Sequence, residues 1–317
     1  MYIDPEVKNL FAKINEQPAP SMDQLSVADA RQRYCDQSAV LGGPVVAINQ
    51  VADFAAEGPA GAIPLRLYRP DGVPEDAAPA LIYIHGGGWV IGSIESHDRV
   101  CRQIAHRASC AVISVEYRLA PEHPAPAAAE DVISALIWIV DHATEIGVDA
   151  GRLAVGGDSA GGSLTAVAAL AARDAGIPLR CQILIYPATD NRDSAWSYPS
   201  RIAYAEVPPL TRPIMEYFRE SFLPDKTAAQ DWRVSPLVVE SVENVATALV
   251  ITGSCDVLHD EGVLYADRLE KAGVAVIRRN FPGMVHGFIE MAGVLTATHL
   301  ALDTIAFVLR EQLVQSK

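Results

Sequence analysis

The chain has 317 residues, half of them hydrophobic and a fifth charged, a composition typical of a globular protein with a sizeable buried core, which excludes a disordered or fibrous one. Its formal net charge of −14 and the lack of a Lys/Arg cluster argue against nucleic acid as a partner and mildly favour uncharged ligands. The length predicts one large domain with a small appendage.

Residues 1 to about 40 predict two short helices, because apolar side chains recur at helical spacing on both sides of a break at Gln17 to Pro20. From about Val45 the pattern changes to short strand-like runs, which end in IPLRLYRP at 63–70. Apolar and polar residues alternate in that last run, so it predicts an antiparallel edge of a sheet.

Continuous apolar runs of strand length follow at 81–84, 111–117, 153–155, 181–186, 248–252 and 274–277. Runs without alternation are typical of strands that are buried on both faces, as in a parallel sheet. Helical stretches lie between and after them, at 127–142, 159–175, 261–272 and 298–315. This order predicts an α/β fold with a mostly parallel central sheet flanked by helices, and with ligands at the carboxyl ends of the strands.

Residues 190–232 interrupt this alternation with a long segment rich in Pro, Tyr and Arg between two strands. Large insertions near strand ends commonly cover a binding site. We therefore expect residues 46–317 to form the main domain, and residues 1–45 together with 190–232 to form a helical cap.

The five cysteines are odd in number and lack CxxC spacing, which argues against a disulfide framework and against a zinc site. The N-terminus lacks the apolar core of a signal peptide, and about 18 apolar residues never run together. We expect a cytoplasmic protein with reduced thiols and no membrane span. The sequence leaves the oligomeric state open, a homodimer being one option.

The sharpest motif is GGDSAGG at 156–162, which places GxSxG around Ser159 directly between a predicted strand and a predicted helix. This is the context that the nucleophile turn of α/β hydrolases requires. Gly157 and Gly161 leave room for a strained turn that projects Ser159 into a cleft, and the helix start offers the Ala160 N–H to an anionic oxygen. For the motif by itself, a glycine-rich turn with a helix-capping serine is the plain structural alternative.

A second motif, HGGGW at 85–89, follows a predicted strand. Three consecutive glycines cost backbone entropy, so they indicate a loop whose backbone approaches a ligand closely or presents N–H groups to it. This fold places its oxyanion donors in such a loop. A phosphate cradle is the alternative, but no GxxxxGK or GxGxxG nucleotide motif accompanies the glycines.

A serine nucleophile needs a general base, and in this fold the base follows the serine and the acid in the chain. His259, His286 and His299 are the histidines that follow Ser159. His286 lies in a glycine-flanked loop just beyond a strand-like run, whereas His299 lies in a helical stretch and His259 lies next to the candidate acids. His286 is therefore the predicted base.

Asp256 is the predicted acid, because it follows the strand-like run at 248–252, whereas Asp260 and Glu261 fit the start of a helix, where negative charge is favoured. Its role would be to accept the Nδ1–H of His286 and to stabilise the imidazolium that forms as Ser159 attacks. The three residues occur in the required order, each at a predicted strand end.

Together, these segments resemble the hormone-sensitive-lipase-like bacterial esterases, a family of α/β hydrolases with an N-terminal helical cap. The resemblance starts at about Leu81 and is carried by HGGGW, EYRLAPEHPAPAA at 116–128, GGDSAGG, YPATD at 186–190, SPL at 235–237, DVLHDEG at 256–262 and GMVHGF at 283–288. It implies hydrolysis of carboxylic esters with short to medium acyl chains, with no metal or organic cofactor. It also implies an oxyanion hole formed by the N–H groups of Gly87, Gly88 and Ala160.

Three neighbouring residues have structural interpretations. Trp89 either lines the acyl pocket or packs its loop against the core, and Arg118 and Glu122 are expected to brace the 116–128 segment through ion pairs. Rival functions are amidase, lactonase or deacetylase action at the same site. A non-catalytic small-molecule receptor is a further rival, although such relatives commonly lose a member of the Ser, His and Asp set that this sequence retains.

Overall fold

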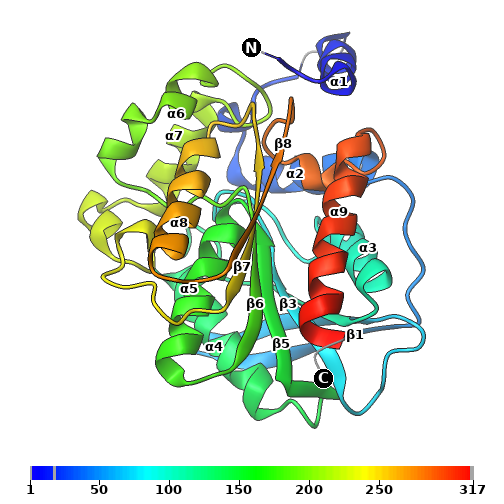
Figure 1. Cartoon of the computed structure of the whole chain (residues 1–317). Helices are drawn as coiled ribbons and strands as arrows, with labels where there is room; N and C mark the ends of the chain where they lie inside the picture. The colour runs from blue at the N-terminus through cyan, green and yellow to red at the C-terminus, as the bar shows by residue number, and fades with distance from the viewer. Residues whose placement is uncertain (1, 17–18, 315–317) are drawn as a thin grey trace.

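The computed structural model describes residues 2–16 and 19–314, and its centre is an eight-stranded sheet (Figure 1). The strands are β1 (Gln50–Gly58), β2 (Gly61–Arg69), β3 (Ala78–Ile84), β4 (Ala111–Val115), β5 (Val148–Asp158), β6 (Leu179–Ile185), β7 (Thr247–Gly253) and β8 (Val276–Phe281). Their order across the sheet is β1-β2-β4-β3-β5-β6-β7-β8. The predicted α/β-hydrolase fold with a mostly parallel sheet is confirmed.

The strand pairing is parallel from β4 to β8 and antiparallel at the other end, where β2 pairs with both β1 and β4. The run at 63–70 is therefore antiparallel as predicted, but it is not the edge of the sheet. Residues 50–58 form the strand outside it. Parallel pairing brings the carboxyl ends of β3, β5, β7 and β8 to one edge of the sheet, where the loops of interest begin.

The apolar runs form central strands because both faces of the sheet are covered. In β3, Ile82 and Ile84 pack into one hydrophobic core, while Leu81 and Tyr83 pack into the core on the opposite face. Side chains alternate across a strand, so a run with no polar position satisfies two cores at once. All seven residues of β3 are buried.

Helices cover both faces of the sheet, and the helices on one face come from distant parts of the sequence (Figure 1). One face carries α3 (Asp98–Ala108) and α9 (Thr296–Leu309), which contact each other, and the other carries α4 (Ala127–Asp141), α5 (Ala160–Ala175) and α8 (His259–Lys271). The helix predicted for 298–315 ends earlier: α9 gives way to a π-helix at Arg310–Val314, and residue 315 lies outside the described residues. Within the described residues, no helix is long and apolar enough to cross a membrane.

Two segments lie over the carboxyl ends of the strands (Figure 1). The N-terminal one holds α1 (Pro5–Glu16), the 3₁₀ helix η1 (Met22–Gln24) and α2 (Val27–Leu41), so the structure contains the two helices expected there; the predicted break at Gln17 to Pro20 falls partly on residues 17–18, outside the described residues. The second holds η2 (Asp193–Ser197), α6 (Pro199–Ala203), α7 (Arg212–Phe222) and η3 (Lys226–Gln230). Helix α7 contacts η1, so the two segments meet. Two more single turns, η4 (Pro236–Val238) and η5 (Phe288–Glu290), complete the helical elements.

A buried ion pair fastens the second segment to the main domain. Arg201 of α6 donates to Glu261 of α8 at 2.6 Å, and both side chains are almost fully enclosed. Burial raises the pKa of Glu261 to about 7, although the charge and hydrogen bonds of Arg201 oppose the shift. Removing one partner of such a pair leaves a buried charge uncompensated.

We predict that Arg201→Met lowers the free energy of unfolding by about 3–5 kcal/mol at pH 8. The measurement is urea unfolding, in which the midpoint should move to a lower urea concentration. The deficit should grow as pH rises, because the pKa of Glu261 in the folded variant would lie above its unfolded value, and stability is then lost on deprotonation. The matched control is Arg212→Met, which breaks the exposed Arg212–Glu216 pair and should cost less than about 1 kcal/mol. Equal losses in the two variants would contradict the prediction.

Candidate active site

Ser159 occupies a strained turn between β5 and α5. Its φ of 56° and ψ of −119° lie in a region that a residue with a side chain rarely adopts. The turn fits because its neighbours are glycines: a Cβ at Gly157 would collide with the Ile84 carbonyl oxygen, and one at Gly161 would collide with the carbonyls of Ile84 and His85. The end of β3 thus lies directly against the turn, which explains why glycines flank Ser159.

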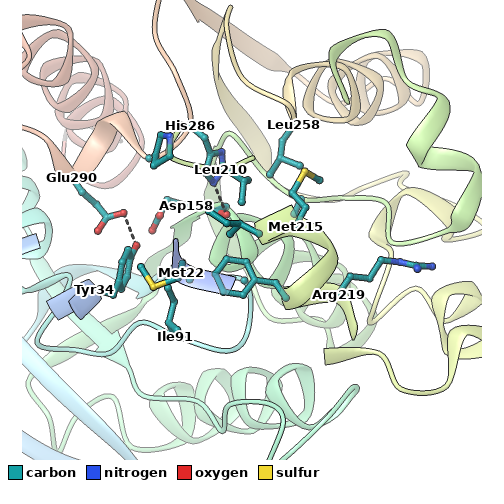
Figure 2. A pocket seen from close by; sticks show the side chains of 18 of the residues that line it. Met22, Tyr34, Ile91, Asp158, Leu210, Met215, Arg219, Leu258, His286 and Glu290 are labelled. Atoms are coloured by element: carbon teal, nitrogen blue, oxygen red, sulfur yellow. Dashed lines mark hydrogen bonds between the residues drawn. The ribbon is translucent and has the colours of Figure 1, made fainter. Parts of the chain in front are cut away.

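The structure brings the three predicted residues Ser159, His286 and Asp256 together, each from a loop or turn at the carboxyl end of a different strand. His286 Nε2 lies 2.8 Å from Ser159 Oγ, and His286 Nδ1 lies 2.8 Å from Asp256 Oδ2. The other Asp256 oxygen accepts the Leu258 N–H at 2.8 Å, which fixes the carboxylate. Figure 2 shows His286 at the pocket, with its hydrogen bond drawn as a dashed line.

The electrostatic surroundings of His286 favour its protonated form. Burial alone would lower the pKa of the imidazole, but the charge and hydrogen bond of Asp256, with the charges of Asp158 and Glu290, outweigh burial and raise the pKa above its ordinary value. An imidazole with this surrounding takes up a proton readily. That property suits a group that removes a proton from a hydroxyl.

The HGGGW loop lines the same pocket as Ser159 through Gly87 and Gly88. Gly87 has φ of 117° and Gly88 φ of 59°, and a Cβ at Gly88 would collide with the ring of Phe218 on α7. Among residues 2–16 and 19–314, the N–H groups of Gly87, Gly88 and Ala160 donate to no acceptor. These N–H groups are therefore available to a ligand, and their role as an oxyanion hole stays a prediction.

Trp89 packs its loop rather than lining the pocket. Its ring stacks on Phe222 of α7, with centroids 4.2 Å apart and planes 7° from parallel, and the residue is 5% exposed. Arg118 makes a bidentate pair with Asp131 at 2.8 Å. Glu122 pairs with Arg31 of α2 at 2.6 Å, so the bracing expected of both residues takes these two forms.

The other two late histidines make contacts with groups other than Ser159. His259 Nδ1 lies 3.1 Å from the Gly253 carbonyl oxygen, and His299 Nδ1 lies 3.0 Å from an Arg107 nitrogen. Each is therefore engaged with its own surroundings. The prediction that neither is the base agrees with these contacts.

A pocket opens above Ser159 between the main domain and the two covering segments (Figure 2). Its wall is mostly apolar, and the side chains come from η1, α7 and the loops at the strand ends: Met22, Ile91, Leu210, Ile214, Met215, Phe218 and Leu258. Apolar walls with a few convergent polar groups are typical of small-molecule sites. The sequence predicts a cover over the site, but it does not mark these wall residues, because their convergence depends on tertiary packing.

A second charged cluster lies beside the pocket and was not predicted. His97 Nε2 lies 3.1 Å from Asp158 Oδ1 and 3.9 Å from Glu290 Oε2. Burial opposes the charge of His97, yet the two carboxylates raise its pKa to about 9. The ligand atoms of the three residues lie within 4.8 Å of one another, but the direct His97–Asp158 pair occupies the atoms that a metal ion would need. Asp158 was visible in the GxSxG motif, whereas nothing local marks His97 or Glu290.

Comparisons with known proteins agree with this architecture. A family model described as an alpha/beta hydrolase fold matches residues 81–290, more than half of the chain. The ethyl acetate hydrolase of Pseudomonas putida is 38% identical over 300 residues, 92% of each chain.

Solved structures give the same result. An ester hydrolase from the metagenome of Lake Arreo, complexed with a derivative of bipyridine phosphonate, matches with a TM-score of 0.92 and 42% identity, covering 97% of this chain and 98% of that one. The hyperthermophilic esterase of the archaeon Pyrobaculum calidifontis matches with a TM-score of 0.92 and 36% identity, covering 98% and 99%. The chain belongs to the α/β hydrolases, and its resemblance to the hormone-sensitive-lipase-like esterases is confirmed.

We predict that Asp256→Asn lowers the pKa of His286, because burial is then opposed by fewer negative charges. The measurement is an NMR pH titration of the imidazole, assigned by the signal that is missing in His286→Gln. Asp260→Asn is the matched control, since Asp260 accepts from the backbone of Ser200 and has no contact with His286. A His286 pKa that is unchanged in Asp256→Asn would contradict the geometry described above.

Proposed function

We propose that the chain is a serine carboxylesterase in which Ser159 is the nucleophile, His286 the general base and Asp256 the residue that orients the base. The observation that carries the proposal is the unbroken series of hydrogen bonds from Ser159 Oγ through His286 to Asp256, at the floor of an apolar pocket. A hydroxyl that shares its proton with a partly enclosed, well-oriented imidazole is an activated nucleophile.

In the first step, Ser159 Oγ attacks the ester carbonyl carbon while His286 Nε2 accepts the hydroxyl proton. The carbonyl oxygen becomes an oxyanion, which receives hydrogen bonds from the N–H groups of Gly87, Gly88 and Ala160. These donors are at hand because no group in the described part of the chain uses them. When the tetrahedral intermediate collapses, the ester C–O bond breaks and the alcohol leaves with the proton from Nε2.

In the second step, water takes the place of the alcohol. His286 Nε2 removes a proton from the water as its oxygen attacks the acyl carbon, and the same N–H donors hold the second oxyanion. Collapse breaks the bond to Ser159 Oγ and returns the proton to it, releasing a carboxylic acid. Groups of the chain carry out every proton transfer, so the proposal assigns no step to a cofactor or metal.

The proposed substrates are uncharged esters with short to medium acyl chains. The mostly apolar wall and the formal charge of −14 both support them. We assign residues 1–45 and 190–232 to a cap over the catalytic domain of residues 46–317, since side chains from both segments line the pocket. Cytoplasmic residence and a homodimer stay predictions from the sequence.

Ser159→Ala tests the proposal directly. We expect it to lower kcat for p-nitrophenyl butyrate by on the order of 10⁵-fold, since removing a nucleophile that acts with its base as one unit loses most of the rate enhancement. Its urea midpoint should stay close to that of the wild type. Retained hydrolysis by a folded variant would refute the assignment of Ser159.

Two further measurements separate the rival functions. Matched ester, amide and lactone substrates on the wild type rank the reaction types, and an acyl-chain series of p-nitrophenyl esters gives the size of the acyl group. Labelling by a fluorophosphonate probe distinguishes an enzyme from a non-catalytic receptor, because the label needs an activated serine. Ser159→Ala is the control for this labelling.

A further inference from the structure

Glu290 connects the N-terminal covering segment to the loop that carries His286. It ends η5, four residues after His286, and its side chain is 10% exposed at the pocket wall. Tyr34 of α2 donates to Glu290 Oε1 at 2.7 Å, and Ser38 of α2 donates to Oε2 at 3.1 Å. Figure 2 shows Tyr34 and Glu290 joined by a dashed line, to the left of His286.

On its inner side the same network reaches the turn at Ser159. Asp158, the residue before Ser159, pairs with His97, and its Oδ1 also accepts from Tyr83 at 2.9 Å and from the Gly86 N–H at 3.0 Å. Gly86 begins the loop that presents the Gly87 and Gly88 N–H groups. The network therefore extends from α2 to both parts of the proposed catalytic machinery.

The charged and titratable groups facing Glu290 come from five elements: Tyr34 of α2, His97 before α3, Asp158 of β5, Tyr186 after β6, and His286. Burial raises the pKa of Glu290, and the His97 cation opposes this shift. His286 in turn faces Asp256, Asp158, Glu290 and the Tyr186 ring. Of these acids, Glu290 is the one that also binds α2.

We propose that Glu290 is a positioning residue of the active site. Its buried carboxylate fixes the position of α2 over the pocket, and it also supplies part of the negative charge near His286. This inference rests on the proposed function. Placing a carboxylate in a mostly apolar wall is costly. Holding α2 does not require this charge, because the exposed Arg31–Glu122 pair already joins α2 to the main domain.

The test is the pH profile of kcat/KM for p-nitrophenyl butyrate in the wild type and Glu290→Gln. The acid limb reports the deprotonation of His286 in the free enzyme. A negative neighbour favours the imidazolium, so its removal should move this limb to lower pH by about 0.5 to 1 unit.

The position of α2 is tested separately by KM, because side chains of α2 line the pocket. Gln keeps an acceptor for Tyr34, so KM of Glu290→Gln should stay within about 2-fold of the wild type. Glu290→Ala removes both acceptors and should raise KM by about 5-fold or more. A KM that is near the wild-type value in Glu290→Gln but raised in Glu290→Ala separates the hydrogen-bonding role of Glu290 from its charge.

Glu122→Gln is the matched control, because it weakens a different attachment of α2, the Arg31–Glu122 pair, without changing the charge beside His286. Its acid limb should coincide with that of the wild type. An acid limb that does not move in Glu290→Gln, or one that moves equally in Glu122→Gln, would overturn the inference. A wild type that neither hydrolyses esters nor takes up the fluorophosphonate label would instead refute the proposed function.

Discussion

The close contact between the end of β3 and the turn at Ser159 is the constraint on which the site depends. The Ile84 carbonyl leaves no room for a side chain at Gly157 or Gly161, and the Ser159 N–H is held by the Ile185 carbonyl of β6 at 2.9 Å. Because β3 continues into the HGGGW loop, the same contact sets the distance between the serine and the backbone donors. The interior strands β3 and β5 therefore fix the positions of the HGGGW loop and of Ser159 relative to each other.

Two aspartates lie near Ser159, and geometry gives them different partners. Asp158 is adjacent in sequence, but Tyr83, the Gly86 N–H and His97 surround its Oδ1. Asp256 is 97 residues beyond Ser159 in the chain, yet it reaches His286 Nδ1. Carboxylates keep both His97 and His286 basic despite burial, and His286 is the one of these two whose second ring nitrogen faces the Ser159 hydroxyl.

Sequence signals predicted what depends on local rules and missed what depends on packing. The strands and the Ser159 turn follow from apolar runs and glycine spacing. Chain order narrowed the choice of base and acid, and positions next to predicted strand ends then selected His286 and Asp256. Helix α3 was not among the predicted helices, although its sequence carries a helical pattern. The residues that the structure buries recur there at helical spacing: Val100, Cys101, Ile104, Ala105 and Ala108. The contacts of His97 with Asp158 and Glu290 had none, since they join three distant segments through tertiary packing alone.

The segment at 190–232 does more than roof the pocket, because α7 touches the donor loop itself. Phe218 lies where a Gly88 side chain would be, Phe222 stacks on Trp89, and the Phe222 carbonyl accepts the Ala125 N–H at 2.8 Å. A shift of α7 would therefore displace the Gly87 and Gly88 N–H groups as well as the apolar wall. In the proposed mechanism those donors stabilise the charge that develops in the transition state, so we expect changes in α7 to alter kcat and KM together. Helix α7 and the loop at residues 85–89 therefore pack as one rigid unit, so the position of the covering segment also fixes the position of the proposed donors.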